Sequence, residues 1–187
     1  MDTLLEYDVI QAVAGHNHSI VLTADGKVFT WGRNDAGALG HGDSYIDIYS
    51  MEDFPRIVEC KQFQQDRIIQ VAAGKGRSAA VSNEGELFVW GRNMGHIPTI
   101  VEKSAFDGLK IRKVALGGEA GKSVIAAITE DGGLYTLGDG SSKLLGMKNL
   151  SGKQPTPIRV KYFEGMNVLD VYCGPGQHIA VKVEKSS

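Results

Sequence analysis

Residues 15–32 read GHNHSIVLTADGKVFTWG, and residues 74–91 read GKGRSAAVSNEGELFVWG, at identical internal spacing. Each stretch begins with a glycine, has a serine four residues later and an acidic residue followed by glycine, and ends in an apolar run with Trp-Gly. A third copy, with Ser123 in the serine position and four extra residues, begins at Gly117, and a fourth begins at Gly174. Such recurrence is typical of repeat folds, in which each copy is one structural unit.

The repeat unit consists of short β-strands. Segments such as SIVLT, KVFTW and ELFVW are rich in β-branched and aromatic residues and end at Asp-Gly or Glu-Gly turn signals, which predicts hairpin-linked antiparallel strands. One further β-rich run precedes each aligned glycine, and a proline-led run follows the first three copies, so a unit has four strands. The aligned glycines are 59, 43 and 57 residues apart, and periods of this length favour propeller blades over helical solenoids.

The first copy resembles the repeats of the regulator of chromosome condensation family, which read V-A-x-G-x-x-H-S/T, then D-G, then V-Y-x-W-G and N-x-x-G-x-L-G. The resemblance covers about residues 9–183 and weakens in the second copy, where Arg77 stands in the position of His18. It implies a β-propeller, commonly of seven blades, and a packing and hydrogen-bonding role for His18. The matching residues are Val13, Ala14, Gly15, His18, Ser19, Asp25, Gly26, Trp31, Gly32, Asn34, Gly37, Leu39 and Gly40.

The strand count predicts an incomplete ring. Three units of four strands and the first two strands of a fourth make fourteen, or three and a half blades, about half of the seven-bladed ring that the resemblance implies. We therefore expect an all-β chain of β-propeller blades, each with four antiparallel strands, in which Trp31 and Trp90 occupy equivalent buried positions. The expected single domain spans residues 1–187, with blades at about 9–58, 68–102 and 111–161 and a partial blade at 168–184.

Half a ring would leave strand edges and apolar blade faces uncovered at both ends. Three arrangements would cover them: the remainder of a longer protein, a second copy of the chain, or a different polypeptide. We expect self-association or completion by another propeller half.

Composition excludes several classes of function. The formal net charge is −2 and the basic residues are scattered, so we expect no direct binding of nucleic acid. The apolar runs are too short for a membrane span, and the first residues, MDTLLEYDVI, lack a signal pattern. These features predict a cytoplasmic protein, with the nucleus as the alternative, in which Cys60 and Cys173 are free thiols.

Neither a cofactor nor a metal is expected. Residues 117–123, GGEAGKS, resemble a phosphate-binding loop, but three residues rather than four separate the first glycine from Gly-Lys, and a strand rather than a helix follows. His16 and His18 would share a strand face, yet no other His or Cys is near in sequence to complete a metal site. No catalytic motif is present, so we expect that the protein is not an enzyme.

Two functions remain. In the first, a rigid propeller presents its inter-strand loops to a protein partner. In the second, the resemblance implies guanine-nucleotide exchange on a Ran-like small GTPase, which requires a wedge, usually an inserted hairpin. The insertions at Tyr45–Asp53 and Glu119–Lys122 are short, and neither is a distinct candidate for that wedge. The candidate binding residues in the loops are Arg33, Asn34, Asp35, Arg92, Asn93, Met94 and Asp139.

Overall fold

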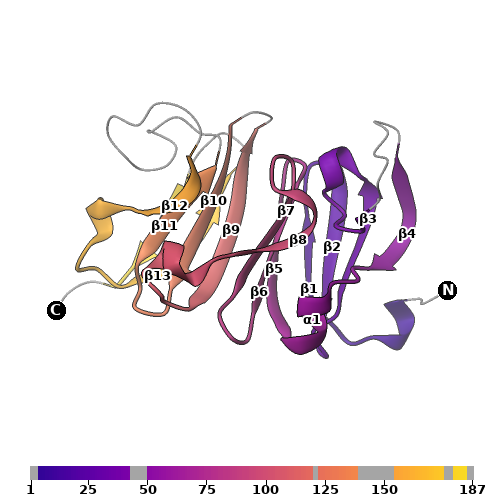
Figure 1. Cartoon of the computed structure of the whole chain (residues 1–187), viewed down its shortest axis with the longest axis horizontal. Coiled ribbons are helices and arrows are strands. Elements are labelled where there is room, and N and C mark those ends of the chain that lie inside the picture. The colour runs from indigo at the N-terminus through magenta and orange to yellow at the C-terminus, as the bar shows by residue number, and fades with distance from the viewer. Residues whose placement is uncertain (1–3, 43–49, 120–121, 139–153, 175–178, 185–187) are drawn as a thin grey trace. The chain divides into compact units, whose positions relative to one another are not determined.

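The computed structural model describes residues 4–42, 50–119, 122–138, 154–174 and 179–184 (Figure 1). Fourteen strands lie in these residues, in three four-stranded sheets and one two-stranded sheet, and all strand pairs are antiparallel. The predicted all-β fold, with three and a half propeller blades, is therefore confirmed. The chain folds as two compact units, Met1–Val101 and Glu102–Ser187. That they form one domain stays a prediction.

The first unit contains two complete blades, which we call blades A and B. In both, strands that are consecutive in the chain are neighbours in the sheet. Blade A comprises β1 (Val9–Ala14), β2 (His18–Thr23), β3 (Val28–Arg33) and β4 (Met51–Ile57). Blade B comprises β5 (Ile68–Gly74), β6 (Arg77–Ser82), β7 (Leu87–Gly91) and β8 (Gly95–Val101).

The second unit contains one complete blade, blade C, and one two-stranded sheet, which we call half-blade D. Blade C comprises β9 (Ile111–Glu119), β10 (Lys122–Thr129), β11 (Leu134–Gly138) and β12 (Gln154–Arg159). Half-blade D comprises β13 (Val168–Cys173) and β14 (Ile179–Val183), the counterparts of the first two strands of a complete blade.

Hydrophobic cores lie between neighbouring blades. Because side chains alternate along a strand, Ile20 and Leu22 of blade A point toward blade B, where Phe88 and Trp90 are part of the same buried cluster. The second unit repeats this arrangement, with Ile128 of blade C and its neighbours packed against the first strand of half-blade D. Within each unit, the earlier blade therefore turns a front face toward the later one, and the later one turns a rear face back toward it.

A short helical turn precedes each blade, and these turns were not predicted from the sequence. They are too short to show helical periodicity, but their aromatic residues recur: Phe63, Phe106 and Phe163 each lie eleven residues before an aligned glycine. The turns are η1 (Leu4–Glu6), α1 (Lys61–Gln65), η3 (Lys103–Phe106) and η4 (Lys161–Phe163).

Before each of the three complete blades, the aromatic residue of the turn, or the one directly after it, packs on the third strand of the blade that follows. In blade B, the rings of Phe63 and Phe88 meet edge to face, with centroids 5.1 Å apart. Tyr7, directly after η1, plays the same part in blade A by packing on Phe29 at 4.9 Å. The pair in blade C is Phe106 and Tyr135, at 5.4 Å.

The two tryptophans occupy equivalent positions in the register but differ in burial. Trp31 lies opposite Ser19 and Trp90 opposite Ser78. Trp90 is fully buried, as predicted, whereas Trp31 is only half-buried, so the prediction of equal burial is wrong for Trp31. The reason is that the front face of blade A covers the rear face of blade B, while the described residues of the first unit place no blade behind blade A.

The insertion in the third copy lengthens a hairpin. Strands β9 and β10 have nine and eight residues, where β1 and β2 have six each. Val124 therefore lies opposite Gly138, as His18 lies opposite Gly32, and the sequence alignment of Ser123 with Ser19 is wrong by two residues. Extra residues added to both strands keep the hairpin ladder continuous, so paired residues move apart along the sequence.

The outermost strands of the three complete blades carry prolines. Because proline has no N–H to donate, it discourages pairing with a further strand and is tolerated at a sheet edge. These prolines are Pro55 in β4, Pro98 in β8, and Pro155 and Pro157 in β12.

We predict that Phe63→Ala lowers the free energy of unfolding by about 2 kcal/mol, because the ring packs on both Phe88 and Trp90 while remaining partly exposed. Phe54→Ala is the matched control, since Phe54 is 67% exposed, and should change that free energy by less than about 0.5 kcal/mol. Urea denaturation followed by circular dichroism measures both. Equal effects of the two substitutions would contradict the role assigned to the turns.

Candidate interaction surface

The loop that follows β3 of blade A is held in shape by its own hydrogen bonds. The side-chain oxygen of Asn34 accepts a bond from the backbone N–H of Leu39 at 3.1 Å, and Thr30 donates its hydroxyl proton to the carbonyl of Leu39 at 2.8 Å. A Cβ on Gly40 would lie 2.8 Å from Nε1 of Trp90, and Gly40 has φ 79°, so this position requires glycine. The loop is therefore fitted closely against blade B.

The carbonyl of Ala38 connects this loop to blade B. It accepts a hydrogen bond from Nε1 of Trp90 at 2.8 Å and another from Oγ of Ser78 at 2.7 Å. Nε2 of His18 lies 2.9 Å from the same Oγ. Because the serine hydroxyl has only one proton and gives it to Ala38, His18 must donate to Oγ through Nε2–H. All four residues are buried, and the packing and hydrogen-bonding role expected for His18 is confirmed.

The loop of blade A lies beside the tight turn between β7 and β8 of blade B. The N–H of Gly42 donates to the carbonyl of His96 at 3.0 Å, and Gly37 is also in close contact with His96. Within the turn, Asn93 has φ 62°, and the N–H of Met94 donates to the carbonyl of Gly91 at 2.8 Å. We call the exposed and half-exposed residues here the loop surface: Arg33, Asn93, Met94, His96 and Ile97.

The predicted binding residues differ in how far they are exposed. Arg33 and Asn93 are exposed and Met94 is half-buried. Asn34, by contrast, is 3% exposed and is used to hold its own loop, so it offers no surface to a partner. Arg92 is half-buried, and its carbonyl accepts a bond from Nε of Arg77 at 2.8 Å.

The side chain of Asp35, and Asp139 as a whole, lie outside the described residues. His96 and Ile97 were not predicted, although they directly follow Arg92-Asn93-Met94-Gly95 in a copy whose loop is shortened. The shortened loop is the sequence signal that could have identified His96 and Ile97, because it places the start of β8 directly at the turn after β7.

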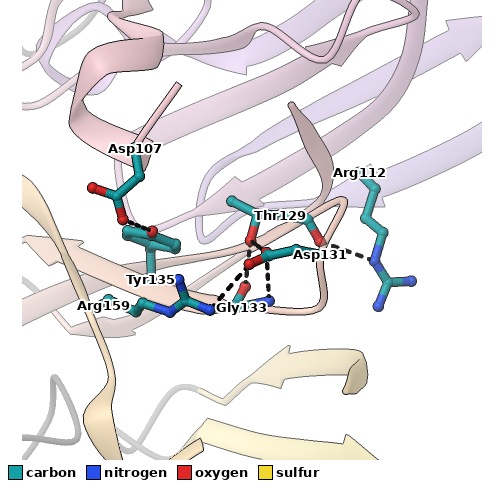
Figure 2. A network of polar contacts seen from close by, with 7 residues as sticks. All are labelled: Asp107, Arg112, Thr129, Asp131, Gly133, Tyr135 and Arg159. Carbon is teal, nitrogen blue, oxygen red and sulfur yellow. Dashed lines mark hydrogen bonds and ion pairs between the residues drawn. The ribbon is translucent and has the colours of Figure 1, made fainter. Parts of the chain in front are cut away.

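The second unit contains a network of polar side chains at the turn between β10 and β11 (Figure 2). One oxygen of Asp131 accepts bonds from the Thr129 hydroxyl and from the N–H of Gly133, and the other lies 3.0 Å from Nη2 of Arg159. These donors, with the Thr129 hydroxyl first, hold the pKa of Asp131 below its usual value. Blade A repeats the bond between threonine and aspartate at Thr23 and Asp25, so this turn is a structural device of the repeat.

Tyr135 joins the same region to the turn before blade C. Its hydroxyl donates to a carboxylate oxygen of Asp107 at 2.5 Å (Figure 2), and its ring packs under the guanidinium of Arg159. Burial of the ring and the bond to Asp107 together raise the pKa of Tyr135 to about 12. A phenol with so high a pKa stays protonated at neutral pH, so we assign it a structural role.

The part of the chain that the structure describes offers no cluster of metal-binding side chains. No three His, Cys, Asp or Glu side chains in it are placed to hold a metal ion. Among the same residues, no helix has the length and apolar character that a membrane crossing needs. Cys60 and Cys173 are free thiols, as predicted, and burial raises the pKa of Cys173 to about 12, which keeps it a poor nucleophile.

The sequence matches the family model described as the regulator of chromosome condensation (RCC1) repeat over residues 25–81 and 131–181, and a second model of the same description over residues 9–38. It is 33% identical to the E3 ubiquitin-protein ligase HERC2 of Mus musculus, over 92% of this chain and 4% of that protein. It is 36% identical to the regulator of chromosome condensation of Homo sapiens, over 74% of this chain and 33% of that protein.

The crystal structure of Prp20p from Saccharomyces cerevisiae, a study that includes its binding properties to Gsp1p and histones, has a TM-score of 0.81 to this chain. The two chains are 23% identical, and the match covers 96% of this chain and 44% of Prp20p. This likeness supports the propeller fold. The chain spans less than half the length of each of these three proteins.

We predict that Trp90→Phe lowers the free energy of unfolding by about 2 kcal/mol, because it removes a buried donor and leaves Ala38 with one hydrogen bond fewer. Trp31→Phe, at the equivalent but half-buried position, should cost less than about 1 kcal/mol. Urea titration of the two variants gives the comparison. If both substitutions lower the free energy of unfolding equally, the covering of Trp90 by blade A does not add to its stabilising effect.

We predict that alkaline pH destabilises the second unit through Tyr135. Its pKa in the folded chain is about 12, above the ordinary 10.0, so its stabilising contribution is complete below pH 10 and is lost as pH rises toward 12. Tyr135→Phe should flatten the fall in unfolding free energy between pH 9.5 and 11.5 relative to the unaltered chain. Denaturant unfolding at several pH values measures this, and parallel curves for the two proteins would contradict the assignment.

Proposed function

The chain belongs to the regulator of chromosome condensation (RCC1) repeat family, and from this premise we propose that it is a non-catalytic protein–protein interaction module that binds its partner through the loop surface. The observation that carries the proposal is the pair of adjacent loops of blades A and B, joined by the Ala38 hydrogen bonds and by the bond from Gly42 to His96. Loops fixed on a rigid scaffold lose little conformational entropy when a partner binds.

The chemistry of the loop surface suits a protein partner. Ile97 is 53% exposed and follows Met94, with its flexible thioether, by three residues, while Arg33 and Asn93 contribute polar groups. An apolar centre with a polar surround, including Arg and Met, is typical of protein interfaces. A net charge of −2, with basic residues scattered along the sequence, does not favour nucleic-acid binding. A location in the cytoplasm, or alternatively in the nucleus, stays a prediction.

The alternative function is guanine-nucleotide exchange on a Ran-like small GTPase, which resemblance to the founding member of the family suggests. The observation in its favour is the lengthened hairpin of β9 and β10, since an exchange factor needs a protruding element to displace nucleotide. The tip of this hairpin, residues 120–121, lies outside the described residues. We do not propose ligase activity for this chain, because the chain spans only 4% of the ligase HERC2.

We predict that Ile97→Glu weakens capture of the protein partner at least tenfold, because it replaces an exposed apolar side chain of the loop surface with a charge. Leu5→Glu is the matched control: Leu5 is 94% exposed in the same unit and lies outside the loop surface. Affinity capture by the immobilised chain, with quantitative mass spectrometry of the bound proteins, identifies partners that the unaltered chain and the Leu5 variant retain. If every captured protein binds the Ile97 variant equally well, the loop surface is not the site.

A nucleotide-release assay separates the two functions. We expect that the chain does not accelerate the release of fluorescent GDP from Ran. Acceleration of tenfold or more would favour the exchange function over the interaction module.

A further inference from the structure

The first unit carries its charges unevenly, although the whole chain has a net charge of only −2. Because consecutive strands are antiparallel, the connections of blades A and B fall at two ends of the sheets. One end, which we call the loop end, carries the loop surface and the turns that lead into β2 and β6. Carboxylates are frequent at the opposite end, where they include Glu6, Asp8, Asp25, Asp66, Glu84 and Glu86.

Basic residues gather at the loop end, where backbone hydrogen bonds join neighbouring turns. The N–H of His16 in blade A donates to the carbonyl of Gly74 in blade B at 3.4 Å. The N–H of Arg92 donates to the carbonyl of Gly76 at 2.8 Å. Lys75 stands between these two glycines in the sequence, so His16 lies on one side of its turn and Arg92 on the other.

Arg33 occupies in blade A the place that Arg92 has in blade B. Both follow the Trp-Gly pair of their copy, and the N–H of Arg33 donates to the carbonyl of Asn17, next to His16, at 2.8 Å. His16 and Arg33 are exposed, whereas Lys75 and Arg92 are half-buried. We call these four residues the basic cluster: His16, Arg33, Lys75 and Arg92.

The backbone around Arg92 is firmly held. Nε of the buried Arg77 donates to the carbonyl of Arg92 at 2.8 Å, which ties the residue to the start of β6. Gly91, directly before it, has φ 98°, and a Cβ at that position would collide with the carbonyl of Gly76. Arg92 therefore leaves β7 at a fixed place beside the turn of Lys75.

Two charges of the basic cluster lack a counter-charge in the part of the chain that the structure describes. The ammonium group of Lys75 forms neither a hydrogen bond nor an ion pair there, and Nε of Arg92 is buried without a hydrogen-bond partner. The described carboxylates nearest this end in sequence position are Glu52, which pairs with Arg56 at 2.8 Å, and Asp53. Half-buried cations without partners have lost water and gained no anion, which favours binding of one.

The composition of the turns favours a polypeptide over a nucleic acid as the source of that anion. The basic residues occupy two adjacent pairs of turns rather than a long stripe. Residues 15–17, 74–76 and 92–97 contain no Phe, Tyr or Trp on which a base could stack.

We propose that the basic cluster binds a segment of the protein partner that is rich in aspartate and glutamate, with carboxylates paired to Lys75 and Arg92. This inference rests on the proposed function as a protein-interaction module and names the chemistry of the partner that the loop end recognises. A guanidinium group binds a carboxylate through two parallel hydrogen bonds, and such charge-assisted bonds are stronger than neutral ones. Attraction between opposite charges also speeds association and weakens as salt is added.

The test uses fluorescein-labelled poly-glutamate and the full chain, with binding measured by fluorescence anisotropy at low salt. We expect saturable binding that Lys75→Glu weakens at least tenfold and that Lys75→Arg, which keeps the charge, changes less than threefold. Lys61→Glu is the matched control, because Lys61 is exposed at the opposite end of the same unit and its substitution changes the net charge equally. It should also stay within threefold. Absence of binding, or equal losses in the two glutamate variants, overturns the proposal.

NMR spectra of the unaltered chain make the test independent of whether the variants fold. Poly-glutamate should shift the amide resonances of Lys75, Gly76 and Arg92, and unmoved resonances overturn the proposal. An oligodeoxythymidylate that binds the same residues more tightly than poly-glutamate would identify a nucleic-acid site instead and would also overturn it.

The same variants separate this inference from the proposed function. If poly-glutamate does not bind while partner capture still depends on Ile97, the acidic-segment inference is refuted and the loop surface stands as the interaction site. If capture is insensitive to Ile97 but poly-glutamate binding requires Lys75, the proposed role of the loop surface fails and the basic cluster remains as an anion-binding site.

Discussion

Much of the first unit depends on a single backbone acceptor, the carbonyl of Ala38. It lies in the loop that follows β3 of blade A but receives its two hydrogen bonds, from Ser78 and Trp90, from blade B. Neither donor has access to water, so either one would be left unsatisfied in the protein interior if the loop moved away. The loop, the burial of Trp90 and the spacing of the two blades are therefore maintained together.

This dependence explains why the blades are not independent. Within each unit, the rear face of the later blade is apolar where it packs against the front face of the earlier one. In blades B and C, the aromatic residue of the preceding turn packs beside the third strand. Stability in such repeats arises from the contacts between neighbours as much as from each unit. A blade that lacks a neighbour, or lacks strands, is thus left with half-buried apolar groups.

The two incompletely covered regions differ in chemistry. Behind blade A, Trp31 is half-buried, but Tyr7 packs on Phe29 and covers part of the face. Half-blade D has its apolar residues turned toward blade C, while the opposite side of the sheet carries Asp170 and Lys182. Tyr172, on the same side as Asp170, is 60% exposed, so this side of half-blade D has mixed polarity, and the expectation of uncovered apolar faces at both ends stays a prediction.

The sequence by itself determined the repeat, the strand count and the hairpin turns, because periodic glycines, β-branched runs and Asp-Gly pairs are local signals. Only the tertiary structure decided which residues at corresponding positions of the repeat have the same surroundings. Trp31 and Trp90, or Arg33 and Asn34, look alike as candidates in sequence, yet burial depends on a neighbouring blade or on a hydrogen bond within the loop. The proximity of the two loops, and the two-residue shift at Ser123, likewise depend on strand pairing and on contacts between residues far apart in the chain.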